Sequence, residues 1–273
     1  MAAEAAARGI PAECGGGIWA LGAGVVLEHT EVSANQAKIG GGICASGVLP
    51  SLELDRSSVT GNTAIDWGGG IVVSGADTEI TQSTVSGNSA GNYGAALGVG
   101  ASFFSDLAVL EHVTFTDNSN GSLAHADLWV HPDAESGTIE IHGSIVEGGC
   151  HDPDGLIASQ GGNVEGPGNS CGFDPLTDQV GVPDMRLEPL AFGNPDLVTR
   201  SHQPRWNSPA VDDPLGNLAG GCPTPDQRLQ ARPKDGDGDG AAACDSGAVE
   251  ARPPIFVDGF ESGDTSSWSV TNP

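Results

Sequence analysis

A short acidic stretch near the carboxyl end carries the clearest pattern for binding a ligand. It reads DGDGDG at residues 235–240, with aspartates two residues apart. This spacing matches positions 1, 3 and 5 of a calcium-binding loop, whose carboxylate oxygens suit a hard cation. Position 12 is Ser246, and the neighbouring Asp245 offers the missing carboxylate. The residues predicted to bind calcium are therefore Asp235, Asp237, Asp239 and Asp245. An exposed acidic loop without a metal is the alternative.

Polar residues also recur in pairs, at intervals of 26 to 30 residues along the chain. Rows of such side chains either line a groove for a polysaccharide or form a solvated face. The members predicted to bind glycan are Glu28, His29, Asp55, Arg56, Gln82, Glu111 and His112.

Two aromatic residues, Trp67 and Tyr93, each stand just before a glycine-rich turn. They could stack against a sugar ring, or they could fill a corner of the fold.

Catalytic patterns are weaker. The stretch GNSCG at 168–172 matches the hydrolase motif G-x-S-x-G, but its neighbours do not read as the strand and helix that this motif requires. A polysaccharide lyase needs a base, and no lysine or arginine lies between Arg56 and Arg186. The remaining candidates for the catalytic base of a lyase are the histidines His29, His112, His125, His131 and His142. The adjacent pair Asp212 and Asp213, the arrangement closest to a hydrolase acid and base, is interpreted as structural. We predict no catalytic residue, and a polysaccharide lyase or glycoside hydrolase is the alternative to a binding module.

A repeating unit must position these side chains. In successive copies an aliphatic residue is followed five residues later by a second apolar residue, and three residues after that by an asparagine. The first apolar positions are Leu27, Leu54, Ile80, Leu110 and Ile141, and the second are Val32, Val59, Val85, Phe115 and Val146. The asparagines are Asn35, Asn62, Asn88 and Asn118, with Gly149 in the fifth copy. Glycine runs at 15–17, 40–42 and 68–70 separate the copies.

The period of about 25 to 30 residues, with β-branched residues and turns in each copy, is the length of one coil of a parallel β-helix. Coils stack about 4.8 Å apart, so equivalent positions form columns along the axis. We expect both apolar columns to face inward, and the asparagines to lie at a bend where their amides bond the next coil. The predicted fold is therefore all-β: a right-handed parallel β-helix, or solenoid, with an irregular, disulfide-containing C-terminal region.

The cysteines and the charge indicate where such a chain works. Cys150 with Cys171, and Cys222 with Cys244, enclose polar loops, while Cys14 and Cys44 flank glycine runs of successive coils. These pairs predict three disulfides and an oxidising compartment; buried free thiols in a cytosolic protein are the alternative.

Acidic residues outnumber basic ones by 36 to 10, which disfavours nucleic acid or an anionic membrane as a partner. No segment is long and apolar enough to span a bilayer.

Several stretches resemble a known group of proteins. VTGNTAIDWGGGI at 59–71 and VSGNSAGNYGAAL at 85–97 are similar to the repeats of bacterial polymorphic outer-membrane proteins and related extracellular β-helix proteins. The carboxyl part resembles the choice-of-anchor Q domain through the stretches LEPLAFGN at 187–194, NSPAVDD at 207–213, DQRLQARP at 226–233 and CDSGAVE at 244–250. This chain departs from that pattern at Leu229 and Gln230, where the family usually has a glycine after the arginine. The resemblance implies a β-helix and export more firmly than any activity.

Together these observations predict a secreted or surface-exposed structural or adhesive module, a monomer, on the outside of a bacterium. Polysaccharide or cell-surface glycans are its expected partners, calcium is its expected cofactor, and no organic cofactor is expected. The predicted organisation has an N-terminal cap with a first partial coil (1–26) and β-helix repeats (27–150). It continues with C-terminal coils and a choice-of-anchor-like region (151–250) and ends in a flexible tail (251–273).

Overall fold

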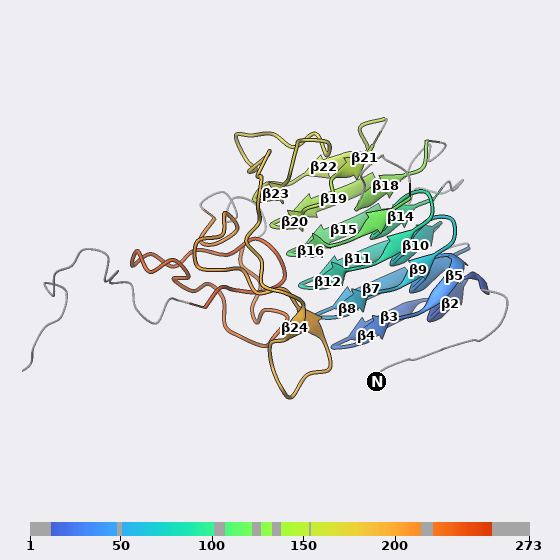
Figure 1. Cartoon of the computed structure of the whole chain (residues 1–273), viewed down its shortest axis with the longest axis horizontal. Helices are drawn as coiled ribbons and strands as arrows, with labels where there is room; N and C mark the ends of the chain where they lie inside the picture. Colours follow the sequence, from blue (N-terminus) through green and yellow to red (C-terminus); the bar gives the residue numbers. More distant parts are fainter. Residues whose placement is uncertain are drawn as a thin grey trace, which may run out of the picture.

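The protein is a parallel β-helix, seen here in a computed structural model (Figure 1). The structure describes residues 12–47, 51–100, 107–121, 127–132, 138–152, 154–213 and 221–252. Within these ranges it contains strands, turns and no α-helix. The predicted N-terminal cap, His125 and almost all of the predicted tail lie outside the described residues.

Each coil contributes short strands to four parallel sheets, which we call A to D in the order in which the chain enters them. Sheet A contains β1 (Ala12–Cys14), β5 (Gln36–Ile39), β9 (Thr63–Ala64), β13 (Ser89–Ala90) and β17 (Ser119–Asn120). Sheet B contains β2 (Ile18–Leu21), β6 (Ile43–Ser46), β10 (Ile71–Ser74), β14 (Leu97–Val99), β18 (Leu128–Val130) and β21 (Cys150–His151).

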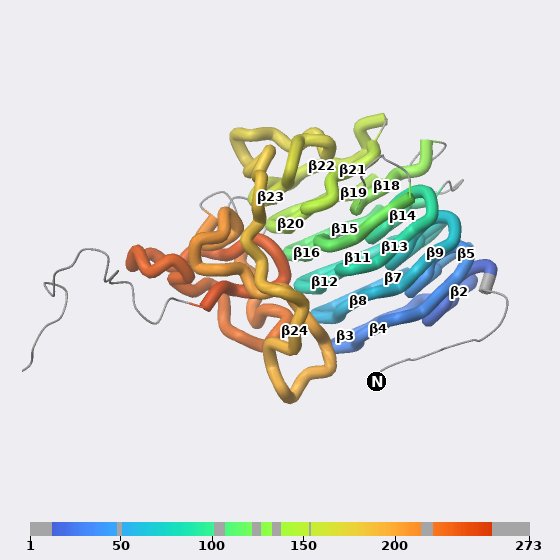
Figure 2. The backbone as a smooth tube through the Cα atoms, in the orientation of Figure 1, coloured from blue at the N-terminus to red at the C-terminus, as the bar shows by residue number. Residues whose placement is uncertain are grey.

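Sheets C and D complete the coil. Sheet C contains β3 (Val25–Glu28), β7 (Ser51–Asp55), β11 (Asp77–Thr81), β15 (Leu107–Glu111), β19 (Thr138–His142) and β22 (Ile157–Ser159). Sheet D contains β4 (Glu31–Ser33), β8 (Ser58–Thr60), β12 (Thr84–Ser86), β16 (Thr114–Thr116), β20 (Ile145–Val146) and β23 (Val164–Glu165). The coils thus continue past residue 150, as the tube in Figure 2 also shows.

The predicted apolar columns form the core. Leu27 pairs with Leu54, Leu54 with Ile80, and so on to Ile141, while the column from Val32 to Val146 is built in the same way in sheet D. Apart from the half-buried Leu27, every member of both columns is at most 1% exposed. Since each buried aliphatic side chain contributes roughly 2 kcal/mol, stacking lets coils that could not fold alone share one core.

The predicted asparagine column is a buried hydrogen-bond ladder at the bend after sheet D. The side-chain oxygen of Asn62 accepts from both the backbone N and the Nδ2 of Asn35, each at 3.0 Å. The same pattern links Asn62 to Asn88 and Asn88 to Asn118. The amides of Asn62 and Asn88 thereby satisfy a backbone N–H and a carbonyl of the preceding coil and also bond the amide of the next coil.

The bend between sheets C and D explains the polar row His29, Arg56, Gln82 and His112. These residues all adopt left-handed backbone, with φ between 45° and 51°, and the next coil has Gly143 there with a φ of 55°. Left-handed backbone is unfavourable for residues with a Cβ, so this position is set by the turn. The regular spacing of the row is therefore a property of the coil geometry.

The chain after β23 folds back over the outer face of sheet D (Figure 1). It contains a single antiparallel strand pair among the described residues, β24 (Ala191–Phe192) with β25 (Arg200–Ser201). The outward hydroxyl of Thr84 donates to Gln227 Oε1 at 2.6 Å, and the Oγ1 of Thr114 accepts from the backbone N of Ala248 at 3.0 Å. Strands β8, β12 and β16 are consequently buried on both faces.

The three predicted disulfides are present: Cys14–Cys44, Cys150–Cys171 and Cys222–Cys244, with Cα atoms 5.7, 4.7 and 5.7 Å apart. The first joins two successive coils and the second joins β21 to the following loop. The third closes a loop of the covering segment. Such cross-links indicate a chain that folds in an oxidising compartment and not in the cytosol.

Candidate functional site: an aromatic pocket

Three aromatic rings gather beside sheets A and B. Trp67 and Tyr93 occupy equivalent positions of successive coils and form a parallel β-bridge, and Trp129 lies on β18. They line an open pocket of about 460 Å³. The other residues that line it are Asp66, His131, Pro132 and His151.

The rings are held in fixed orientations. Tyr93 stacks on Trp129 with ring centroids 5.3 Å apart and planes at 10°, while Trp67 meets Trp129 edge-on at 5.2 Å. Tyr93 is 42% exposed and Trp129 only 5%, so the buried indole supports the phenol ring that faces solvent. The aromatic cluster is thus both a packed corner and a partly exposed surface.

Glycines in β14 and just after it make room for this cluster. A Cβ on Gly98 would lie 2.9 Å from the Trp67 ring, and one on Gly100 would lie 3.0 Å from it. These distances are shorter than almost all real Cβ contacts, so a side chain at either position would push against the indole. The two glycines therefore leave room for the Trp67 ring next to Trp129.

Polar groups surround the aromatic surface. Asp66 accepts a hydrogen bond from Asn92 Nδ2 at 2.6 Å, which fixes its carboxylate at the rim. His131 meets Trp129 edge-on at 5.2 Å, and His151 lines the same pocket. Aromatic faces combined with a few placed polar groups are typical of sites that bind a ligand with both an apolar face and hydroxyl groups.

The predicted glycan row is exposed only in its first coils. Arg56 forms ion pairs with Glu28, at 3.3 Å, and with Asp55, and His29 Nε2 lies 3.8 Å from the same Glu28 carboxylate. The positive charge of Arg56 thus offsets much of the negative charge of Glu28 and Asp55. They lie on the surface where sheet C turns into sheet D.

Two later members of the row, Gln82 and His112, are covered by the C-terminal segment. Gln82 is 3% exposed and donates to the carbonyl of Pro223 at 2.8 Å, and His112 is fully buried beside Cys244. Half-buried Glu111 lies next to His112 in the chain. Among the described residues the seven predicted members therefore do not form one continuous exposed groove.

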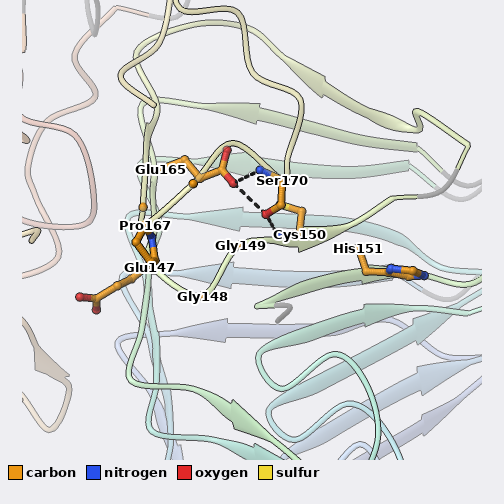
Figure 3. Close-up of a pocket in the computed structure, with 10 residues that line it drawn as sticks. Glu147, Gly148, Gly149, Cys150, His151, Glu165, Pro167 and Ser170 are labelled. Atoms are coloured by element: carbon orange, nitrogen blue, oxygen red, sulfur yellow. Dashed lines mark hydrogen bonds between the residues drawn. The ribbon is translucent and has the colours of Figure 1, made fainter. Parts of the chain in front are cut away.

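A second cleft, of about 370 Å³, lies around Glu165 and Ser170 (Figure 3). Glu165 Oε1 accepts from the Ser170 hydroxyl at 2.9 Å and from the backbone N of Ser170 and Cys171. Burial raises the pKa of Glu165, against the lowering effect of these hydrogen bonds. Figure 3 shows the Glu147 and His151 side chains pointing away from this carboxylate on opposite sides. The loop that lines this cleft is thus held in place by Glu165. Ser170 does not directly follow a strand or precede a helix, so GNSCG lacks the surroundings that the hydrolase motif requires.

The acidic loop groups its carboxylates differently from the sequence prediction. Oxygen atoms of Asp235, Asp237 and Asp212 lie within 4.8 Å of one another, whereas Asp239 is not part of this cluster. The Asp212 carboxylate already accepts from three backbone N–H groups, those of Gly236, Asp237 and Ala243. Calcium binding by this loop stays a prediction, and the carboxylate that lies beside those of Asp235 and Asp237 is Asp212 and not Asp239.

Asp245 lies apart from the loop's carboxylates, inside a buried charge network. Its oxygens accept from the backbone N of Asp212 and of Ala251. Burial, followed by the nearby Glu250 charge, raises the pKa of Asp245 to about 8. Glu250 in turn pairs with the fully buried Arg232, whose Nε donates at 2.6 Å. These residues of the DQRLQARP and CDSGAVE stretches hold the C-terminal segment together, so their role here is structural.

No helix among the described residues is long and apolar enough to cross a membrane. Comparison of the chain with protein-family models, with curated proteins and with solved structures found no match. The functional argument therefore rests on the side chains of this chain alone.

Sequence reasoning found two of the three rings, Trp67 and Tyr93, but did not connect them to Trp129, His131 or His151. Trp129 lies 36 residues after Tyr93, beyond the last clear glycine run, where the repeat pattern is degraded. Its place beside the other two rings follows from the pairing of β14 with β18, which aligns Trp129 with Gly98 and which no sequence spacing indicated.

Proposed function

We propose that this chain is an exported β-helix surface module that binds carbohydrate at the pocket formed by Trp67, Tyr93 and Trp129. The observation that carries the proposal is the stacked, 42% exposed ring of Tyr93, supported from below by Trp129 and edged by Asp66, His131 and His151. The apolar face of a sugar ring stacks on an aromatic side chain, and its hydroxyls need neighbouring hydrogen-bond groups.

The surroundings of the pocket support this role. Three disulfides fit an extracellular or cell-surface location, and the net charge of −26 fits an uncharged or cationic saccharide better than an anionic one. A structural or adhesive role at the cell surface is part of this proposal. The stiff stack of coils would hold the pocket at a fixed place on such a surface.

The test is a glycan array followed by titration of the selected oligosaccharide, with tryptophan fluorescence as the readout. Tyr93→Ala should weaken binding about tenfold, because loss of one stacking contact costs roughly 1.4 kcal/mol. Trp206→Ala is the matched control, since Trp206 is 55% exposed and lies in the C-terminal segment, away from the pocket. Equal loss in both variants, or no ligand on the array, would contradict the proposal.

The same samples test the enzymatic alternative. Incubation of the wild-type chain with the selected polysaccharide, followed by measurement of new reducing ends, should show no turnover. Turnover abolished by Glu165→Gln would move the assignment to a glycoside hydrolase acting at the second cleft, because Glu165 is the buried carboxylate there whose pKa is raised.

A further inference from the structure

Two histidines and a glutamate meet at the bend between sheets C and D. Glu111 ends β15 and His142 ends β19, and the two residues are paired in register across the sheet. His112 follows Glu111 in the left-handed turn, with its ring edge-on to His142 and the ring centroids 5.5 Å apart. One ligand atom of each of the three side chains lies within 4.8 Å of the others.

Both imidazoles are buried and incompletely paired. His112 is 0% exposed and His142 is 6% exposed. His142 Nδ1 lies 2.8 Å from the carbonyl of Gly161 and donates to it, so the lone pair of this ring is on Nε2. Within the described part of the chain neither His142 Nε2 nor His112 Nδ1 has a hydrogen-bond partner. Buried nitrogens without partners are uncommon, because each costs about 1–3 kcal/mol.

The backbone is shaped for this pair of rings. A Cβ at Gly143 would lie 2.6 Å from the Cε1 atom of His112, so a glycine is needed there for both the turn and the imidazole. In the preceding coils the same two columns have Thr81 with Gln82, Asp55 with Arg56 and Glu28 with His29. Among the described coils only Glu111 is paired with a histidine of the next coil, His142, so the three-residue cluster is not a consequence of the repeat.

We propose that Glu111, His112 and His142 bind a divalent transition metal, with Zn²⁺ as the best-fitting ion. Two imidazole nitrogens and one carboxylate oxygen form a common zinc ligand set, and a water molecule completes the tetrahedron. Ligand atoms around tetrahedral zinc are about 3.3 Å apart for bonds of about 2.0 Å, so atoms that now lie within 4.8 Å of one another must approach by roughly 1.5 Å at most.

The surroundings of the cluster give the ion a way in. A pocket of about 210 Å³ opens beside Glu111 and His142. The site adjoins the buried contact of His112 with the Cys244 region, so a bound ion would fasten the C-terminal segment to the coils.

The experiment uses the full chain, treated with a chelator, dialysed and then titrated with zinc chloride by calorimetry, with bound zinc measured by elemental analysis. We expect one ion per chain and a melting temperature raised by roughly 5 °C when zinc exceeds its dissociation constant a hundredfold. Glu111→Gln should weaken zinc binding at least tenfold with little change in the metal-free melting temperature. His142→Ala should abolish binding.

Glu79→Gln is the matched control, because Glu79 is an exposed glutamate on β11 of the same sheet and lies outside the cluster. It should bind zinc like the wild type. If His142→Ala fails to fold, Glu111→Gln alone decides the question. The proposal is overturned if the wild-type chain binds no zinc, if Glu111→Gln binds it unchanged, or if binding is lost only in Asp235→Ala of the acidic loop.

Discussion

Buried ionisable side chains are the distinctive feature of this protein at the level of single residues. Asp127 lies directly before β18 and is 1% exposed, and its Oδ2 accepts from the backbone N of Gly148 at 2.7 Å. Burial outweighs this hydrogen bond and raises the pKa of Asp127 from 3.8 to about 7. The folded chain therefore keeps a proton on this carboxyl at pH values where the unfolded chain has released it.

Stability should consequently fall as the pH rises from about 4 to about 7, since the unfolded state binds fewer protons in this window. At about 1.4 kcal/mol per pKa unit, the Asp127 contribution to this loss is on the order of 4 kcal/mol. Asp127→Asn keeps an acceptor for Gly148 and removes the titration. We expect its free energy of unfolding, measured with denaturant, to change less between pH 5 and pH 8 than that of the wild type.

Asp77→Asn, at an exposed position on β11, serves as the control and should follow the wild-type pH dependence. An Asp127→Asn chain with an unchanged pH profile would show that Asp127 is already ionised in the folded state.

At the level of the elements, the asparagine ladder joins the coils where the chain leaves sheet D. Asn62 is fully buried; it accepts two hydrogen bonds from Asn35 and donates to Asn88 Oδ1 and to the carbonyl of Val32. Asn35, in the first described coil, donates in the same way, but its own Oδ1 has no partner among the residues described. The side-chain oxygen of Asn62 therefore accepts hydrogen bonds that removal of the side chain would break, whereas that of Asn35 accepts none.

We expect Asn62→Ala to lower the free energy of unfolding by about 1–3 kcal/mol, because it leaves the backbone N–H of Asn35 buried without a partner and removes the hydrogen bond from Asn62 to the carbonyl of Val32. Asn35→Ala should cost less, since no group donates to its side chain. Chemical denaturation of both variants measures the difference. Equal losses would mean that the ladder hydrogen bonds contribute little beyond the volume of the side chains.

At the level of the whole molecule, the C-terminal segment completes the fold by covering sheet D. One of its anchors is Arg200, whose Nε donates to Glu31 Oε1 at 2.8 Å and whose guanidinium also reaches Thr60 Oγ1 at 2.8 Å. Glu31 is 7% exposed, so its charge depends on this arginine. Arg205 forms a comparable pair with Glu188 in the same segment, but both side chains there are about half exposed.

Arg200→Met should therefore lower the free energy of unfolding by about 2 kcal/mol or more, because it leaves the Glu31 carboxylate buried without its counter-charge. Arg205→Met, which breaks an exposed ion pair, should cost less than about 1 kcal/mol. Thermal melts of the two variants at the same pH make the comparison. Similar melting temperatures would indicate that the C-terminal segment is held by its apolar contacts and disulfides alone.

The amino-acid sequence by itself determined the coil. The apolar columns and the asparagine ladder could be predicted, because each depends on a spacing that recurs from coil to coil. The three disulfides could be predicted because each cysteine pair either flanks glycine runs of successive coils or encloses a short polar loop. A residue such as Val59 faces inward for the same local reason as Val32 and Val85, and stacking in register then aligns the columns.

Only the tertiary structure decided which polar residues are accessible and which come together. Gln82 and His112 repeat the pattern of His29 and Arg56, yet they are buried because a segment more than 100 residues later in the chain docks over them. Trp129 joins Trp67 and Tyr93 only through the pairing of distant strands. Such contacts depend on how non-repeating segments pack, and no local spacing encodes that packing.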